Sequence, residues 1–316
     1  MLRFLIFLLL GLPSLNAAEP KAPGATVASV DLRHVTSFGR RGNGPGHFYE
    51  PSSIAVDPLG NVFVADTGND RLQKFDERGR YKTEVGGFGW EPGQFNQPSG
   101  VATGKGGLEI YVADSRNSRI QVFSSHLRLL GIVGGRDADG SIVLGTLSGI
   151  AVTESGELMV NDLDADQLIQ ISTYDLEDRS FGGFGYGAGN LSRPQAIAVD
   201  GEGRFYVADQ ENHRVAVFDR FGNYVGEIGK GTLLAPEGVC MGPRELLYVA
   251  DTGHHRVLVF DRVTGRVAGR IGGPDDGNEK GAFKGPRAVA GYRDFLYVLD
   301  SGNHRIQKFR VTVAGP

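Results

Sequence analysis

The sequence predicts an all-β fold, and three of its features indicate this: a phrase repeated six times, strand-like segments of alternating polarity, and one such segment displaced to the N-terminal side. The phrase is valine, usually alanine, and then aspartate, and it ends at Asp66, Asp114, Asp162, Asp209, Asp251 and Asp300. The steps between these aspartates are 48, 48, 47, 42 and 49 residues. A near-constant period of this length indicates a solenoid or a propeller.

Four short segments of strand character recur in each unit. In the first unit they are residues 54–56, 62–65, 71–75 and 81–85, and turns rich in glycine, asparagine and aspartate separate them. Apolar and polar residues alternate with a period of two, which is typical of strands rather than helices. Four antiparallel strands form a propeller blade, so six such units predict a six-bladed β-propeller of four-stranded antiparallel blades.

The two ends of the repeat region predict how the ring closes. The last unit stops after its third strand, residues 305–309, and lacks a fourth. Residues 35–39 match the fourth-strand pattern and stand just before the first unit. We therefore expect this N-terminal strand to complete the last blade, because pairing there closes the ring and removes two open sheet edges.

The first residues of the chain are typical of an export signal. Arg3 precedes an apolar run over residues 4–12, and small residues follow at Ala17 and Ala18. The run is about half of the roughly 20 residues that a spanning helix needs, so it predicts a cleaved signal peptide and no membrane insertion after cleavage. We expect a signal peptide over residues 1–18, a short linker over 19–30, a propeller over 31–312, and a periplasmic or extracellular location.

The charge and cysteine content exclude some classes of function. A formal net charge of −4 provides no basic field for phosphate backbones, so we expect no nucleic-acid partner. Cys240 is the single cysteine and excludes an intramolecular disulfide. It replaces the alanine of an inner strand, which favours a small buried residue over a nucleophile.

Several phrases of the repeat identify a resemblance to a known family. Residues 51–57, 66–72 and 302–306 resemble the NHL repeat, and the similarity extends over about residues 35–311. Six repeats in register make the resemblance specific, and it implies a six-bladed propeller. With the signal-like N-terminal residues, we expect an exported, bacterial member of the family. RNA binding, known among NHL proteins, conflicts here with the expected export signal and the acidic balance.

The repeated aspartate has a partner five residues later in five of the six units. That partner is arginine at Arg71, Arg119, Arg214, Arg256 and Arg305, and Gln167 is the exception. A charge-assisted hydrogen bond across the intervening loop would lock the hairpin. Because a catalytic site is needed only once, a pair present in nearly every blade favours a structural role.

Differences between blades indicate where a ligand site lies. The loop before each inner strand reads Pro-x-Gly or a close variant, and x is Ser52, Ser99, Ser148, Gln195, Glu237 and Arg287. We expect these side chains to form a polar ring at the mouth of the central channel, with Gln195, Glu237 and Arg287 as candidate ligand-binding residues. Arg287 suits a carboxylate held by two parallel hydrogen bonds. The alternative is that Glu237 and Arg287 pair with each other and plug the channel with water.

Trp90 and Tyr186 lie in glycine-rich loops that lead into inner strands on the same face. Exposed aromatic residues often anchor binding partners, so both are candidate outer anchors of the site. The alternative is that each packs onto a neighbouring blade, because aromatic rings of this size also bury well in cores.

The sequence offers only weak candidates for a metal site. His213, His255 and His304 occupy equivalent positions in three blades, which should place them too far apart to share one ion. Asp162, Asp164 and Asp166 could present oxygens to calcium, but a solvated acidic loop is the favoured interpretation. We expect no metal site apart from this weak calcium candidate, and no other cofactor.

The favoured function is an exported, non-catalytic binding or scaffolding propeller that engages a protein, peptide or glycan through the channel-mouth face. No nucleophile with an adjacent base and no cofactor motif is evident, so no catalytic residue is assigned. The alternative is a metal-dependent lyase or lactonase-like hydrolase on the same fold. The peptide-amidating lyases, which have an NHL-like propeller, hold zinc through histidines at the x position, and none of the six x residues here is histidine.

Overall fold

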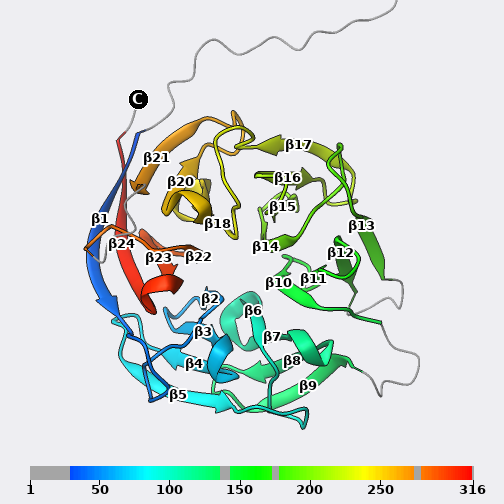
Figure 1. The fold of residues 1–316 in the computed structure, drawn as a ribbon, viewed down its shortest axis with the longest axis vertical. Helices are drawn as coiled ribbons and strands as arrows, with labels where there is room; N and C mark the ends of the chain where they lie inside the picture. The colour runs from blue at the N-terminus through cyan, green and yellow to red at the C-terminus, as the bar shows by residue number, and fades with distance from the viewer. Residues whose placement is uncertain (1–28, 136–142, 173–177, 274–278, 315–316) are drawn as a thin grey trace, which may run out of the picture.

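The chain folds into six four-stranded antiparallel sheets that stand as blades around a central axis, as the sequence predicts (Figure 1). The computed structural model describes residues 29–135, 143–172, 178–273 and 279–314. The predicted signal peptide, residues 1–18, and most of the predicted linker, residues 19–30, lie outside this part of the chain. Within the described ranges, no helix has the length and apolar character needed to cross a membrane.

The first three blades are formed by consecutive strands, the first of each nearest the axis and the fourth at the rim (Figure 1). The strands of blade 1 are β2 (Ser53–Val56), β3 (Val62–Asp66), β4 (Arg71–Phe75) and β5 (Tyr81–Gly86). Those of blade 2 are β6 (Pro98–Thr103), β7 (Glu109–Asp114), β8 (Arg119–Ser124) and β9 (Leu129–Gly134). Those of blade 3 are β10 (Leu147–Val152), β11 (Leu158–Asp162), β12 (Gln167–Ile171) and β13 (Arg179–Gly182).

Blades 4 and 5 follow the same order, and only blade 6 departs from it. The strands of blade 4 are β14 (Pro194–Val199), β15 (Phe205–Asp209), β16 (Arg214–Phe218) and β17 (Tyr224–Ile228). Those of blade 5 are β18 (Gly238–Met241), β19 (Leu247–Asp251), β20 (Arg256–Phe260) and β21 (Val267–Gly272). Those of blade 6 are β22 (Pro286–Tyr292), β23 (Phe295–Asp300), β24 (Arg305–Ala314) and, at the rim, β1 (Ser29–Phe38).

Short 3-10 turns follow the second strand of four blades, on the face that carries the channel mouth. They are η1 (Thr67–Asn69), η3 (Ser115–Asn117), η5 (Thr252–His254) and η6 (Ser301–Asn303). Two others, η2 (Lys105–Gly107) and η4 (Pro243–Glu245), connect first to second strands at the opposite end.

The hydrophobic core lies between blades rather than within them. Every residue of β3 and β15 is buried, whereas β5 alternates between half-buried and exposed residues because its outer side faces solvent. Each of the six core clusters combines residues of two neighbouring blades. The ring is therefore one cooperative core in which every blade depends on both of its neighbours.

The N-terminal strand closes the ring, which confirms the prediction. β1 pairs antiparallel with β24 from Ser29 opposite Ala314 to Phe38 opposite Ile306, with one irregularity between His34 and Thr36. The pairing is longer than the sequence pattern indicated, because β24 continues to Ala314 and offers backbone partners to residues before Val35. Blades 5 and 6 then share a core cluster that includes the half-buried Val30 and Leu32 of β1.

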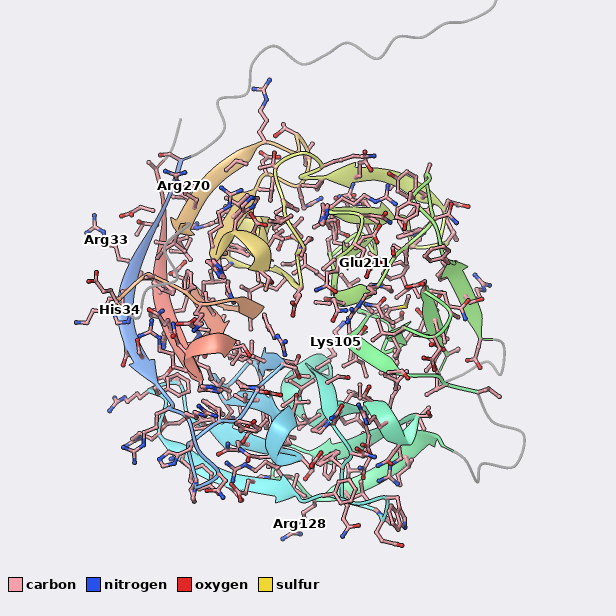
Figure 2. The ribbon with its side chains drawn as sticks, in the orientation of Figure 1. Arg33, His34, Lys105, Arg128, Glu211 and Arg270 are labelled. Carbon is pink, nitrogen blue, oxygen red and sulfur yellow. The ribbon has the colours of Figure 1, made fainter. Side chains whose placement is uncertain are left out.

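Arginine side chains project from the rim of the ring (Figure 2). Arg33 of β1, Arg128 before β9 and Arg270 of β21 are exposed and point away from the axis. Exposed apolar residues such as Leu130 and Val225 share these outer strands. The outward charges oppose edge-to-edge pairing of the outer strands with other chains.

The repeated aspartate and arginine form the pairs that the spacing predicts. Arg Nε donates to the aspartate at 2.6–2.8 Å in all five blades that have the arginine. In blade 4, Asp209 also accepts the Ser192 N–H, and Arg214 donates to the carbonyls of Gly187 and Asn190. The pair therefore fixes the loop that enters the same blade as well as its own hairpin.

Two of the three equivalent histidines connect neighbouring blades. His213 Nδ1 accepts the Ala235 N–H at 3.0 Å, and His255 Nδ1 accepts the Gly285 N–H at 2.9 Å. Both donor residues have left-handed backbone conformations, with φ of 46° and 53°. Because these rings stabilise the loops of successive blades, they do not converge on a shared metal position.

Ring closure can be tested within β1 itself. We expect Leu32→Ser to lower the free energy of unfolding by about 1 to 3 kcal/mol and to promote aggregation, because it weakens the strand that covers the edge of β24. Val35→Ser, on the exposed side of the same strand, is the matched control and should change stability by less than about 0.5 kcal/mol. Thermal unfolding and light scattering measure both effects, and equal behaviour of the two variants would contradict the assignment.

The structural role of the aspartate–arginine pair can be tested between blades. Asp209→Ala should cost about 3 to 5 kcal/mol, because it leaves Arg214, which is 1% exposed, with Glu227 in place of two carboxylate partners and removes the acceptor of two further N–H groups. Asp162→Ala is the matched variant in blade 3, where Gln167 replaces the arginine, and it should cost only about 1 to 3 kcal/mol. Denaturant unfolding gives both values, and equal losses would mean that the arginine is not what makes the aspartate necessary.

Candidate functional site

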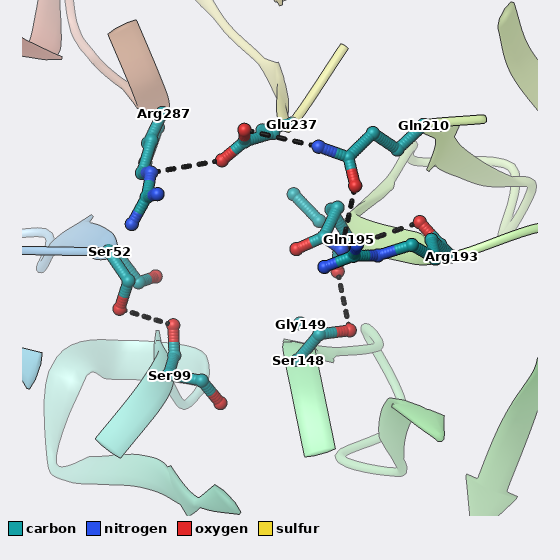
Figure 3. A pocket seen from close by; sticks show the side chains of 12 residues that line it. Ser52, Ser99, Ser148, Gly149, Arg193, Gln195, Gln210, Glu237 and Arg287 are labelled. Atoms are coloured by element: carbon teal, nitrogen blue, oxygen red, sulfur yellow. Dashed lines mark hydrogen bonds and ion pairs between the residues drawn. The ribbon is translucent and has the colours of Figure 1, made fainter. Parts of the chain in front are cut away.

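All six x residues line one pocket at the channel mouth (Figure 3). The pocket has a volume of about 300 Å³ and is partly open to solvent. Its remaining lining residues are Ser53, Gly149, Arg193, Ala196, Gln210 and Ala288. The structure therefore brings together the three predicted ligand-binding residues Gln195, Glu237 and Arg287, each at the start of the inner strand of its own blade.

In blades 2, 3 and 5 a glycine follows x and lets the inner strand approach its neighbour closely. A Cβ at Gly238 would lie 2.6 Å from the Arg287 carbonyl oxygen, and one at Gly149 would overlap the Gln195 carbonyl. A residue with a side chain at these two positions would therefore push the neighbouring blade away.

The three serines of the ring link neighbouring blades through hydrogen bonds. Ser52 Oγ donates to the Ser99 carbonyl at 2.8 Å, Ser99 Oγ to the Leu147 carbonyl at 2.8 Å, and Ser148 Oγ to the Pro194 carbonyl at 2.6 Å. Each hydroxyl thus joins its blade to the next. Because their protons are engaged by the backbone, the serines contribute little to the chemistry of the pocket.

The other half of the ring carries a chain of polar side chains (Figure 3). Gln195 Nε2 donates to Gln210 Oε1 at 3.3 Å, and Gln210 Nε2 donates to Glu237 Oε1 at 3.1 Å. Arg287 Nε lies 3.2 Å from Glu237 Oε2. Glu237 and Arg287 therefore form an ion pair, as the alternative interpretation of the sequence expects. The pair does not fill the pocket.

Sequence reasoning missed Gln210, although the repeat contained the signal. In four blades the residue after the repeated aspartate has a hydroxyl that donates to a carbonyl of the next blade at 2.6–2.8 Å: Thr67, Ser115, Thr252 and Ser301. Gln210 occupies this position in blade 4 and reaches the Glu237 side chain instead. Comparison of this position across blades would have identified it.

Arg193 is the second residue that the sequence analysis missed. It lies two residues before Gln195 in a left-handed conformation, with φ of 50°, and its N–H donates to Asp166 Oδ1 at 2.7 Å. This conformation is costly for a residue other than glycine, and the aspartate stabilises it. The Arg193 side chain lines the pocket, where its charge acts on Glu237 (Figure 3).

Burial and charge oppose each other at Glu237. Its side chain is 18% exposed, and burial raises the pKa of its carboxyl group, while the charges of Arg287 and Arg193 lower it by a smaller amount. Two guanidinium groups and one carboxylate give the pocket a net charge of +1 when all three are ionised. The mouth is thus locally positive in a chain whose formal net charge is −4.

The structure places Trp90 and Tyr186 outside the mouth pocket. Their side chains are 69% and 68% exposed, so neither is packed into the interface with a neighbouring blade. Trp90 lines a separate groove of about 850 Å³ with Pro92 and Ile132. The rings of Tyr186 and Phe184 pack edge to face with their centroids 5.9 Å apart. Both are accessible to a large partner, but neither touches the polar chain.

The three aspartates in the loop of blade 3 accept hydrogen bonds from backbone N–H groups. Asp162 accepts the N–H groups of Gly145 and Asp164, Asp164 accepts that of Thr146, and Asp166 accepts that of Arg193. Among the residues that the structure describes, no three histidine, cysteine, aspartate or glutamate side chains are grouped so that they could hold a metal. The calcium expectation at these aspartates gains no supporting geometry.

Cys240 has the character of a structural residue. Burial raises the pKa of its thiol to about 12, and the side chain packs at the core between blades 5 and 6. A thiol that stays protonated at neutral pH is a poor nucleophile.

Comparison with known proteins identifies the repeat. The NHL repeat family matches residues 48–75, 95–123, 191–218 and 233–260. Together with the six-bladed architecture, these four matches show that the chain is an NHL-repeat β-propeller.

The named relatives differ in kind. The chain is 28% identical over 208 residues to the protein brain tumor of Drosophila melanogaster, covering 66% of this chain and 15% of that protein. It is 27% identical over 191 residues to a probable peptidyl-alpha-hydroxyglycine alpha-amidating lyase, pgal-1, of Caenorhabditis elegans, covering 57% of this chain and 53% of that protein. The chain therefore matches less than two thirds of the length of either relative.

A solved structure shares the fold. It is a protein of unknown function from Bacteroides thetaiotaomicron, with a TM-score of 0.70 and 15% identity, covering 90% of this chain and 76% of that one. At this identity the likeness concerns the fold alone.

The pocket does not have the donors of an amidating-lyase zinc site. The resemblance to those lyases implies histidines at x, but the six x residues here are three serines, a glutamine, a glutamate and an arginine. One carboxylate beside two guanidinium groups is a poor set of ligands for zinc, which prefers imidazole and thiolate. We therefore assign no metal-dependent step to this pocket.

The electrostatic account of Glu237 predicts a pH-dependent change in stability. Because its folded pKa is raised above the ordinary value of 4.5, ionised Glu237 opposes folding. Glu237→Gln should therefore raise the free energy of unfolding near pH 7. The gain should shrink as pH falls through the folded pKa and vanish below about 4.5. Denaturant unfolding across this range measures the effect, and a variant less stable than the native protein at pH 7 would contradict it.

Proposed function

We propose that this chain is an exported, non-catalytic binding propeller that engages a protein, peptide or glycan through the channel-mouth face. The observation that carries the proposal is the polar chain Gln195–Gln210–Glu237–Arg287, which borders an open pocket on one side of an otherwise serine-lined ring. Such convergent polar groups in a concave site are typical of ligand recognition.

The rigidity of the frame supports a binding role. The x residues stand at the starts of the inner strands of a closed ring, and hydroxyl-to-carbonyl hydrogen bonds join blades 1 to 4 at the mouth. A preorganised site loses little conformational entropy on binding. A pocket of about 300 Å³ holds an end group or one side chain, so a large partner would also rest on the surrounding loops.

The accessible aromatic residues support contact with a larger partner. Trp90 and Tyr186 lie in the loops that lead into blades 2 and 4, on the face that carries the mouth. Residues of this kind are enriched where partners bind. They would act as outer anchors for a ligand whose end occupies the mouth.

Export is the second part of the proposal. It rests on the signal-peptide pattern of residues 1–18 and implies a periplasmic or extracellular location. The formal net charge of −4 supports a partner other than nucleic acid.

A lyase or hydrolase is the second candidate, favoured by the likeness to the amidating lyase and by a buried carboxyl group in the mouth. Metal analysis of the purified protein separates the two candidates. One tightly held stoichiometric metal would favour the enzyme, and metal-free protein that binds its ligand would favour the binding module.

The binding proposal predicts that the mouth determines ligand capture. On a random-peptide array and a glycan array, the native protein should bind a defined subset, and Glu237→Ser with Arg287→Ser should abolish that binding because it leaves a nearly uniform ring. The matched control is Arg244→Ser with Asp294→Ser, an exposed charge pair at the opposite end of the blades. Native binding by the mouth variant, with its fold intact by circular dichroism, would overturn the proposed site.

A further inference from the structure

The hydrogen-bond donors of the mouth are not all used. Arg287 contacts Glu237 through Nε, and its side chain is 45% exposed. Its terminal nitrogens extend beyond that contact into the open pocket (Figure 3). Within the described ranges, no hydrogen bond or ion pair involves these two nitrogens.

Arg193 offers a second unengaged guanidinium. Its backbone N–H is held by Asp166, which positions the residue at the mouth. No hydrogen bond or ion pair to its guanidinium occurs among the described residues, although its charge acts on Glu237. Arg193 belongs to blade 4 and Arg287 to blade 6, so the two cations border the pocket from different sides (Figure 3).

Both oxygens of the pocket's carboxylate are already engaged. Glu237 Oε1 accepts from Gln210, and Glu237 Oε2 lies against Arg287 Nε. The hydroxyl protons of the three serines at the x positions are bonded to backbone carbonyls, so the guanidinium N–H groups are the main donors that remain for a ligand. Two guanidinium groups against one engaged carboxylate favour an anionic ligand over a cation or a neutral group.

Charge and shape narrow the kind of anion. The pocket has a net charge of +1, which matches one carboxylate, whereas a phosphate monoester carries nearly two negative charges. Paired terminal nitrogens of a guanidinium also match the two oxygens of a carboxylate. Among the residues that the structure describes, no aromatic side chain lines the pocket, so this part of the chain offers no stacking surface that would favour a sugar ring.

We propose that the mouth pocket recognises the carboxylate group of an acyclic ligand. The carboxylate is held between Arg193 and Arg287. Glu237, which accepts a hydrogen bond from Gln210, holds Arg287 in place. The proposal rests on the proposed function and names the chemistry of the ligand at that same site. Glu237 is a positioning residue, since it orients Arg287 and does not itself bind the carboxylate.

The test uses small probes and arginine side-chain NMR of the full chain. N-acetylglycine should shift the Nε–Hε signals of Arg193 and Arg287, and it should bind at least about tenfold more tightly than N-acetylglycinamide, which has the same shape without the charge. Arg193→Gln and Arg287→Gln should each weaken binding about tenfold or more. Arg244→Gln, exposed at the far end of the blades, is the matched control and should have no effect.

Two further probes identify the source of the anion. Tighter binding of methyl glucuronide than of N-acetylglycine would overturn the acyclic assignment, and tighter binding of methyl phosphate would overturn the carboxylate assignment. Equal affinity for acid and amide, or no binding of any carboxylate probe, would also overturn the inference. If the carboxylate inference fails but the Glu237→Ser, Arg287→Ser variant still loses binding of the array ligands, the proposed function stands. If that variant binds the array ligands normally, both the proposed function and the carboxylate inference are wrong.

Discussion

The pairing of β1 with β24 is the constraint on which the mouth pocket depends. Each core cluster is shared by two neighbouring blades, so a ring with one incomplete blade would expose apolar surface and a strand edge at the same place. Closure also sets the position of β22, whose first residues carry Arg287 toward the axis. The geometry of one binding side chain therefore depends on a strand about 250 residues away in the sequence.

A second set of contacts converts this closed ring into a site with two different halves. Serines at three of the six x positions donate to backbone carbonyls and join blades 1 to 4. Blades 4 to 6 replace these links with longer side chains that contact one another, which creates an open, positively charged half. A ring of identical residues would offer six equivalent weak sites, whereas this asymmetry can orient one ligand.

The fold could be predicted because the same sequence pattern recurs in every blade. Part of the site could be predicted because blades 4 to 6 differ from the other blades at the x position. The six aspartates indicated six blades, and the x position located Gln195, Glu237 and Arg287 because neighbouring blades supply serine there. Gln210 escaped because its side chain contacts a side chain of the next blade, where four of its counterparts donate to a backbone carbonyl. Arg193 escaped because its role depends on a left-handed conformation that an aspartate of blade 3 stabilises. Both depend on contacts between blades that strand periodicity does not describe.

The carboxylate proposed to bind between the two arginines can be observed in a crystal structure of the full chain soaked with N-acetylglycine. We predict density for the carboxylate within hydrogen-bond distance of both Arg193 and Arg287, with Gln210 still bonded to Glu237. Density on the serine side of the ring, in the groove beside Trp90, or nowhere in the mouth of a crystal in which the pocket is open to solvent would contradict the account.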